Sequence, residues 1–455
     1  MVIQKGTIRL AKYIEIIDYI SSESKNKNIK AGKKLPSIRE LADKFNCSTV
    51  TVARAYKELE LQHLIYSVPK SGYYLVSKHF NESEGDLSID FSTVLSDMDI
   101  IPYDEFHHCI DHAMKIHKSD LFTYGDSQGL PALVSTIEKH LQDYQVFCKS
   151  SQIAITAGSQ QAVNILTKLN FPNCKKNILV ENPTYDRLLQ NFKMHDMNVI
   201  GIDRNFNGID MDKLEMIFRE KDIKFFYTVP RFHNPLGSSY SMSEKKEILR
   251  LAQKYDVYIV EDDYLVDLDT SSSNDPIYSL DTEDRVIYLK TFSKILLPGL
   301  RIAAAVLPKF LMPSFLTFRQ FSDIHTSTLS QGALDIYIKN GMFKMSKLRL
   351  KKTYADRMAH LKKICNDFEP SVLKANIPDT GFFLSLESKN PINFDKLLVA
   401  LAKKGIIIKD ARECFLTSDN GINLIKISIS RTDKQKISAG MNEIYNYFSS
   451  SSAIV

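Results

Sequence analysis

The chain has 455 residues, of which 44% are hydrophobic and 25% charged, and its formal net charge is +5. This length predicts two or three domains with a sizeable core, and the composition is that of an ordinary globular protein. Because the chain has neither an apolar run of about 18 residues nor a signal-peptide pattern at its start, we expect a cytoplasmic protein that does not enter membranes.

Cysteine and histidine usage argues against two further classes of protein. The six cysteines show no Cys-x-x-Cys spacing, which argues against a disulfide framework and against a zinc ribbon. His107, His108, Cys109 and His112 lie close together, but a second ligand pair is lacking, so we expect no metal site. Basic residues crowd the N-terminal part of the chain, and this distribution says more about nucleic-acid binding than the small net charge does.

Residues 1–76 have the pattern of a winged helix-turn-helix. Ser37 and Glu40 have capping-box spacing at a helix start, and Ser48 caps the next helix after a turn at Asn46. Two short strands follow, joined by a turn that contains a proline and a glycine. The expected elements are a helix at 10–20, a basic turn at 30–34, a helix beginning after 37, a helix at 49–61 and strands at 66–68 and 73–76.

The segment that begins at Leu35 resembles the GntR family of bacterial repressors, whose pattern includes a Leu-Pro-Ser-x-Arg-x-Leu-Ala helix start and a glycine in the wing. In that family the second helix enters the major groove and the wing touches the neighbouring backbone. Thr49 stands where the family has an arginine, so a strong guanine reader is missing and the operator sequence is not predicted. The resemblance, and charge alone for Arg54 and Lys70, implies contact with double-stranded DNA by Arg39, Ser48, Thr49, Thr51, Arg54, Lys70 and Gly72.

A polar stretch at 77–88 has no apolar period and is expected to be an interdomain linker. Beyond it, residues 89–448 alternate strand and helix in the manner of an α/β domain with a mostly parallel sheet. Ligands of such sheets bind at the carboxyl ends of the strands. The expected strands are 153–156, 177–181, 198–202, 224–228, 257–261, 285–289 and 302–307.

Side chains suited to one cofactor follow several of these strands. Lys294 comes after the strand at 285–289 and can form a Schiff base with a carbonyl group, and Arg301 can bind a phosphate bidentately. Ser159 opens a helix whose first N–H groups can also bind a phosphate. Further candidates at strand ends are Tyr185, Asn234, Asp262, Asp263 and Tyr264.

In this order the segments resemble the fold-type I aminotransferases of class I and II, which bind pyridoxal 5'-phosphate, over nearly all of residues 90–448. The resemblance implies that Lys294 forms the Schiff base and that Asp262 pairs with the protonated pyridine nitrogen, which makes the ring an electron sink. It also implies that Asn234 and Tyr264 hydrogen-bond the ring hydroxyl and that Tyr185 stacks on the ring. The implied phosphate ligands are Ser159, Gln160, Ser293 and Arg301.

Two of these assignments have alternatives. Asp263 is the second candidate for the pyridine partner, and Lys290 is a weaker candidate than Lys294 because we expect it at the edge of its strand. Tyr124 lies in a segment that resembles the family segment reaching the phosphate of the neighbouring subunit, which implies a homodimer with shared sites. The resemblance divides the domain into a cofactor-binding large part at about 120–325 and a C-terminal small part at about 345–448.

One departure from the family concerns the carboxylate of the bound amino compound. Aminotransferases of this fold bind it with an arginine on a late strand, in a pattern like Ile-Arg-Leu-Ser-Phe, where this chain has Lys426. Lysine keeps the charge but lacks the bidentate fork, which disfavours the fixed geometry that turnover needs. Arg187 and Arg431 are further candidates for the carboxylate contact, with surface salt bridges as the alternative for both.

A winged helix followed by an aminotransferase-like domain is the architecture of the MocR subfamily, so the chain resembles a pyridoxal-phosphate-dependent transcriptional regulator. Three interpretations remain open, and we favour them in the following order. The first is a regulator that senses a small amino compound. The second is a regulator that senses free pyridoxal phosphate, and the third is a working aminotransferase with an appended DNA-binding module.

Overall fold

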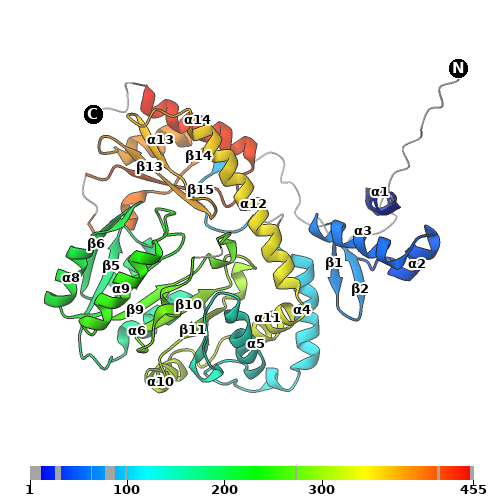
Figure 1. Cartoon of the computed structure of the whole chain (residues 1–455), viewed down its shortest axis with the longest axis horizontal. Coiled ribbons are helices and arrows are strands. Elements are labelled where there is room, and N and C mark those ends of the chain that lie inside the picture. Colours follow the sequence, from blue (N-terminus) through cyan, green and yellow to red (C-terminus); the bar gives the residue numbers. More distant parts are fainter. Residues whose placement is uncertain are drawn as a thin grey trace.

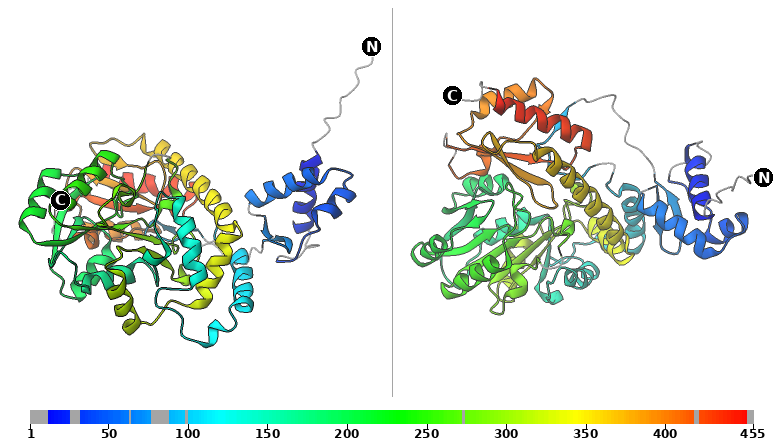
Figure 2. Two further views of the ribbon diagram at one scale, coloured as in Figure 1. Left: turned by 60° about the horizontal axis from the view of Figure 1, so that its bottom comes forward. Right: turned by 45° about the horizontal axis from the view of Figure 1, so that its top comes forward.

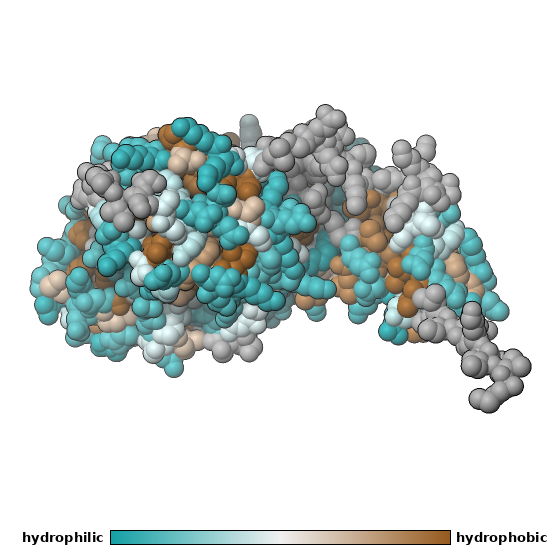
Figure 3. Space-filling view, turned by 90° about the horizontal axis from the view of Figure 1, so that it is seen from above, coloured by the Kyte–Doolittle hydropathy of each residue, from teal (hydrophilic) through white to brown (hydrophobic). Residues whose placement is uncertain are grey.

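The structure is a computed structural model that describes residues 12–25, 32–62, 64–76, 88–97, 100–271, 274–417 and 421–450. The predicted linker lies outside the described residues except for Ser88, and so does the start of the first predicted helix. A small N-terminal part, blue in Figure 1, lies beside a larger body that contains the main sheet. Figure 3 shows both parts from above, with hydrophilic residues covering most of this face.

The N-terminal part is the predicted winged helix-turn-helix. Ser37 and Glu40 form the capping box, and the Ser48 side chain accepts a hydrogen bond from the N–H of Thr51 at the next helix start. Each such cap stabilises a helix by about 1 kcal/mol. Buried Val52, Ala55, Tyr56 and Leu59 pack the second of these helices onto the rest. The elements are α1 (Lys12–Lys25), α2 (Ile38–Lys44), α3 (Thr49–Leu61) and the antiparallel hairpin of β1 (Ile65–Val68) and β2 (Gly72–Leu75).

The main sheet confirms the predicted α/β class, with strands in the order β4-β11-β10-β9-β8-β5-β6-β7. Neighbouring strands from β10 to β6 are parallel, while β11 is antiparallel to both of its neighbours. The inner parallel strands β5, β8, β9 and β10 are buried almost throughout because helices cover both faces, whereas β6 is mostly half-buried or exposed. The strands are β4 (Ile153–Thr156), β5 (Asn177–Asn182), β6 (Val199–Asn205), β7 (Gly208–Ile209), β8 (Ile223–Thr228), β9 (Tyr258–Asp262), β10 (Val286–Thr291) and β11 (Ala303–Val306).

The helices of the body divide between two hydrophobic cores. One core joins one face of the main sheet to α4 (Tyr103–Ile116), α5 (Pro131–Gln142), α6 (Ser159–Lys168), α7 (Asp186–Met194), α10 (Met312–Ser322) and α11 (Thr328–Lys339). The other core joins the opposite face to α8 (Met211–Glu220) and α9 (Met242–Lys254). This sandwich leaves the carboxyl ends of the parallel strands at one edge, where a ligand site is expected.

A C-terminal part covers that edge. The long helix α12 (Met342–Cys365) leads into it, and its own core lies between a small antiparallel sheet and two helices. Its further elements are β12 (Leu373–Asn376), β13 (Phe383–Ser388), α13 (Phe394–Ala402), β14 (Ile406–Ile407), β15 (Leu424–Ser428) and α14 (Lys434–Ser449). The short strand β3 (Ile89–Asp90) pairs with β14, so residues 88–97, here named the strap, run between this part and the main sheet.

Candidate functional site

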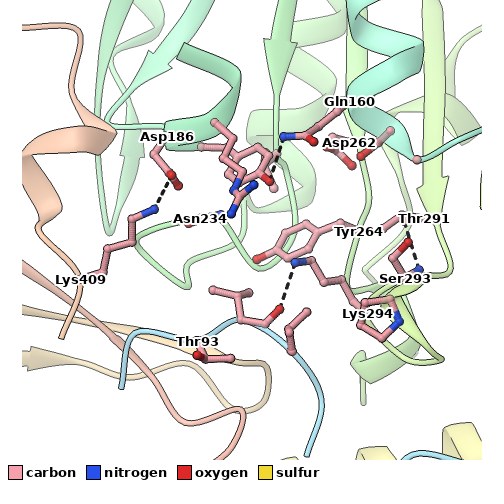
Figure 4. A pocket seen from close by; sticks show the side chains of 18 of the residues that line it. Thr93, Gln160, Asp186, Asn234, Asp262, Tyr264, Thr291, Ser293, Lys294 and Lys409 are labelled. Carbon is pink, nitrogen blue, oxygen red and sulfur yellow. Dashed lines mark hydrogen bonds and ion pairs between the residues drawn. The ribbon is translucent and has the colours of Figure 1, made fainter. Parts of the chain in front are cut away.

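A cavity of about 630 Å3 lies where the strap, the main sheet and the C-terminal part meet. Side chains from strands distant in the sequence point into it, and Figure 4 shows them around a common space. The cavity brings together these sequence-predicted residues: Ser159, Gln160, Tyr185, Arg187, Asn234, Asp262, Tyr264, Ser293, Lys294, Arg301 and Lys426.

Lys294 lies just beyond the end of β10, and its Nζ donates a 3.0 Å hydrogen bond to the carbonyl oxygen of Val94 in the strap. Burial, and after it the positive charge of Lys426, lower the pKa of the Lys294 amine to about 8. A lysine with this pKa is partly unprotonated near neutral pH, which is the form that attacks a carbonyl group.

Asp262 is the last residue of β9, and its two carboxylate oxygens differ in their surroundings. Oδ2 accepts a 2.8 Å hydrogen bond from the hydroxyl of Tyr227, whereas the buried Oδ1 has no hydrogen-bond partner among the described residues. Burial raises the pKa of Asp262 to about 6. A buried oxygen without a partner is costly, so Oδ1 suits a cationic donor such as a protonated pyridine nitrogen.

The opposite end of the cavity suits a phosphate. Gly158 has φ +103° before the start of α6, and a Cβ there would lie 2.6 Å from Nη2 of Arg301. The same Nη2 donates to the carbonyl oxygen of Ala157 at 3.0 Å, which holds the guanidinium beside the helix start. The Ser293 hydroxyl oxygen is buried without a partner among the described residues. Helix N–H groups, a guanidinium and a free hydroxyl are the donors that a phosphate needs.

Asn234 and Lys426 form the floor between these two ends. Nζ of Lys426 donates to Oδ1 of Asn234 at 2.6 Å, which leaves the amide N–H groups of Asn234 available as donors. Burial lowers the pKa of Lys426. Tyr264 lines the same region, and its hydroxyl donates to the carbonyl oxygen of Phe232 at 2.6 Å.

A third wall carries charged groups from α7 and from the segment after β14. Lys409 and Asp186 form an ion pair there, and Asp410 pairs with Arg412. Arg187 lies on the same wall but is exposed, and no hydrogen bond or ion pair of its side chain is found within the described part of the chain.

Four residues predicted for this site lie away from the cavity, and one of them, Tyr124, is 82% exposed. Lys290 is inside β10 rather than at its edge as predicted, and it is fully buried in an ion pair with Asp267, 2.5 Å away. Asp263 points to a different environment and pairs with buried Arg231. Arg431 is exposed and does not line the cavity.

Sequence reasoning missed Tyr227 and the strap. Tyr227 lies near the end of β8, next to β9, and the available signal was its phenol at the carboxyl end of a predicted parallel strand. The strap contributes Ser92, Thr93, Val94 and Leu95 to the cavity. These residues have no distinctive spacing, and the contact of Val94 with Lys294 uses only a backbone carbonyl.

The candidate DNA-binding residues lie in two places on the N-terminal part. Arg39, Ser48, Thr49 and Arg54 are exposed on α2 and α3 or at their starts, with Thr51 half-buried between them. Lys70 and Gly72 lie at the tip of the hairpin, with φ +61° and +123°. The Arg54 guanidinium lies 4.3 Å from the ring centre of Tyr13, so packing occupies one of its faces.

Comparison with known proteins identifies both parts of the chain. Residues 12–75 match the gntR family of bacterial regulatory proteins, and residues 100–444 match the aminotransferase class I and II family. An uncharacterized HTH-type transcriptional regulator of Bacillus subtilis, YcxD, is 39% identical over 445 residues, which cover 96% of this chain and 100% of the relative. The chain belongs to the MocR-type GntR regulators.

Enzymes resemble only the larger part of this MocR-type chain. An aromatic-amino-acid aminotransferase of Thermococcus litoralis is 30% identical over 72% of this chain and 80% of its own length. The crystal structure of Pyrococcus horikoshii kynurenine aminotransferase, in complex with PMP, superposes with a TM-score of 0.74 and 28% identity, covering 80% of this chain and 91% of that one. These similarities confirm the predicted fold-type I architecture.

Two further features are absent from the described residues. No group of three or more His, Cys, Asp or Glu side chains there could hold a metal ion. Within the same residues, no helix is both long and apolar enough to cross a membrane.

Proposed function

We propose that this protein is a DNA-binding transcriptional regulator whose aminotransferase-like part binds pyridoxal 5'-phosphate and senses a small amino compound. The observation that carries the proposal is that one cavity is lined by the amine of Lys294, the guanidinium of Arg301 and the carboxylate oxygen of Asp262 that has no hydrogen-bond partner among the described residues. These groups suit the aldehyde, the pyridine nitrogen and the phosphate of the cofactor. The full-length similarity to the regulator YcxD supports the DNA-binding half of the proposal.

In this proposal the cofactor, when bound, supplies an electron sink at the substrate amine. Lys294 attaches it, Asp262 keeps the pyridine nitrogen protonated, and Tyr185 packs on the ring. Asn234 donates to the ring oxygen through the amide group that Lys426 leaves free, and Tyr264 lies beside it. Ser159, Gln160, Ser293 and Arg301 hold the phosphate. The PMP bound by the P. horikoshii enzyme supports this assignment.

The charges that remain in the cavity define the effector. Asp186 and Asp410 are neutralised by Lys409 and Arg412, while Lys426 has, within the described part of the chain, the uncharged Asn234 as its hydrogen-bond partner. Together with exposed Arg187, the excess is positive, so we propose an amino compound that carries a carboxylate. Free pyridoxal phosphate is the second candidate effector. Aminotransferase turnover is the third candidate activity, and the similarity to the T. litoralis enzyme favours it.

We also propose a homodimer that shares its sites. Tyr124 is 82% exposed and absent from the cavity of its own chain, although the family resemblance assigns it to a phosphate. Large apolar side chains nearby in the sequence are exposed as well, among them Phe122 at 83%. Exposed apolar groups of this size mark interaction sites.

The proposed division of the chain is 1–76 for DNA binding, 77–88 for the linker and 89–448 for effector binding. We propose that the protein acts in the cytoplasm, where duplex DNA is accessible in a bacterium.

The test is borohydride reduction of the protein mixed with pyridoxal phosphate, followed by peptide mapping. We expect a yellow protein whose reduced label lies on Lys294, because this amine is inside the cavity and has a lowered pKa. A label on Lys290, or no label, would contradict the proposal.

A further inference from the structure

The winged helix-turn-helix is docked on the body through one aromatic cluster. The hydroxyl of Tyr66 in β1 lies 2.5 Å from Nε2 of His108 in α4, and the two form a hydrogen bond. The His108 ring also lies 4.9 Å from the ring of Tyr74 in β2. Tyr66 is only 1% exposed although it belongs to a two-stranded hairpin, and Val68 packs against the core of the body. Figure 2 shows the hairpin beside α4 in both views.

The helix that receives the hairpin is fixed to the body by a buried ion pair. Glu105, one turn before His108, accepts hydrogen bonds from both Nη atoms of Arg349 in α12, each at 3.1 Å. Both side chains are almost fully buried. A movement of α4 relative to α12 would leave these charges unpaired, so α4 is a fixed surface for the hairpin, and release has to occur at the contact between the hairpin and α4.

The strap connects this helix to the cavity. It ends a few residues before α4, and Arg357 of α12 pairs with Asp97 at 2.5 Å. At the cavity it is held to Lys294 twice, since Val94 accepts from the Lys294 amine and the Ser96 hydroxyl donates to the Lys294 carbonyl oxygen. Figure 4 shows the first of these contacts.

The contact with Val94 uses the same amine that would attach the cofactor. A group that engages Nζ of Lys294 competes with the carbonyl of Val94 for it, and therefore loosens the strap at this point. Because the strap ends at Asp97 and α4 begins at Tyr103, a short length of sequence joins the cavity to the helix that carries the docking cluster. Coupling between two such sites is reciprocal. If filling the cavity favours undocking of the winged helix, undocking raises the affinity of the cavity for its ligand by the same factor.

We propose that the contact of Tyr66 and Tyr74 with His108 is a docking switch, in which the docked arrangement holds Val94 on Lys294 and filling the cavity favours release of the winged helix from α4. The proposal rests on the proposed function, because it takes pyridoxal phosphate as the ligand of the cavity. It adds how a ligand bound in the cavity changes the contact between the DNA-binding part and the body.

The test measures pyridoxal phosphate binding by visible absorbance in the unmodified chain and in His108→Ala. Removal of the docking partner favours the released state, so we expect about fivefold or more tighter binding, the lower range of typical coupling between sites. Tyr66→Phe removes only the hydroxyl and is expected to shift affinity in the same direction by less. His107→Ala is the matched control, because His107 is exposed and, although its ring lies 6.2 Å from that of His108, no contact with Tyr66 or Tyr74 is found among the described residues. It is expected to bind like the unmodified chain.

Amide hydrogen exchange supplies a second measurement on the same proteins. Saturation with pyridoxal phosphate is expected to speed exchange in β1 and α4 of the unmodified chain, whereas His108→Ala exchanges fast there without ligand. Equal affinities in all four proteins with ligand-independent exchange would overturn the switch and leave the proposed function standing. Weaker binding of pyridoxal phosphate by His108→Ala would mean that docking favours binding, which is the opposite of the proposed switch and would overturn it. Absence of binding by the unmodified chain would overturn the proposed function as well.

Discussion

The amine of Lys426 donates a 2.6 Å hydrogen bond to Oδ1 of Asn234 and lies 4.5 Å from the ring centre of Phe383. Its charge is therefore anchored at the floor of the cavity rather than presented as a planar fork. The anchored lysine orients the Asn234 amide so that its N–H groups remain free as donors. An amino compound would meet a single point charge there, which attracts its carboxylate without fixing its rotation.

Sustained transamination is accordingly expected to be slow or absent, although an amino compound of the right shape attaches to the cofactor. Turnover needs the α-hydrogen held perpendicular to the ring, and a misplacement of about 1 Å can cost about a hundredfold in rate. Single-turnover spectra with a range of amino acids measure attachment and turnover separately. Lys426→Arg restores the fork and is expected to raise turnover. Rapid multiple turnovers of an ordinary amino acid and a 2-oxoacid by the unmodified chain would favour the enzyme interpretation.

Attachment of pyridoxal phosphate is expected to accelerate as the pH rises through about 8 and to level off above it. The attacking amine must be unprotonated, and the pKa of Lys294 is lowered to about 8 by burial and then by the charge of Lys426. Lys426→Met removes that charge, so the pKa of Lys294 rises and the midpoint moves to higher pH. Lys426→Arg keeps the charge and serves as the control. Stopped-flow absorbance across the pH range measures the midpoints, and an unchanged midpoint in Lys426→Met would contradict the electrostatic account.

Replacing Asp262 by alanine and replacing Asp263 by alanine are expected to have different effects on cofactor retention and on stability. Asp262→Ala removes the pyridine partner and is expected to weaken retention of the cofactor with a loss of stability of about 1–3 kcal/mol, because the group that loses its acceptor is the uncharged hydroxyl of Tyr227. Asp263→Ala removes the closer of two carboxylate partners of buried Arg231, leaving Asp269 at 3.7 Å, and also removes the acceptor of the Tyr288 hydroxyl. It is expected to lower the free energy of unfolding by about 3–5 kcal/mol. Dialysis and thermal unfolding separate the two effects. Equal cofactor loss would reassign the pyridine partner.

Arg39→Ala and Lys70→Ala are expected to weaken DNA binding without changing cofactor absorbance, because both side chains are exposed on the winged helix-turn-helix and distant from the cavity. Each lost phosphate contact lowers the slope of log affinity against log salt by about 0.9. Fluorescence anisotropy with duplex DNA at several salt concentrations measures the slope. Lys396→Ala removes an exposed lysine from α13 and is the control. Unchanged slopes in both variants would count against the DNA-binding assignment.

Sharing of sites between subunits predicts complementation. Tyr124→Ala and Lys294→Ala chains are each expected to retain little cofactor. A mixed dimer has one complete site, in which Lys294 of one chain meets Tyr124 of the other. Because random refolding of the two variants together gives mixed dimers in about half of cases, about a quarter of all sites are expected to bind the cofactor. Absorbance after co-refolding measures the recovery. No recovery would show that Tyr124 serves its own chain or no site.

Much of this arrangement is predictable from the sequence because it depends on local signals. The caps at Ser37 and Ser48 mark helix starts, and the lysine segment after β10 and the Gly158 turn before α6 lie where strand ends meet. The position of such residues in the fold is predictable from the residues that precede them in the chain.

The unpredicted features depend on long-range packing. The hydroxyl of Tyr227 reaches Asp262 only because β8 and β9 are neighbours in the sheet, and Val94 reaches Lys294 across about two hundred residues of sequence through a backbone carbonyl. Lys290 was assigned to a strand edge, but its pairing with Asp267 lets a charged side chain stay inside β10. No local sequence pattern predicts contacts between residues that lie so far apart in the chain.

The most direct test of the regulator account is one titration that follows the visible absorbance and a DNA footprint together. Purified protein on duplex DNA carrying its operator receives free pyridoxal phosphate first and then a series of amino compounds that carry a carboxylate. The account predicts that one amino compound shifts the absorbance and the DNA occupancy at the same concentrations, because one cavity controls both. Spectral changes that run to completion with no change in DNA occupancy would contradict it.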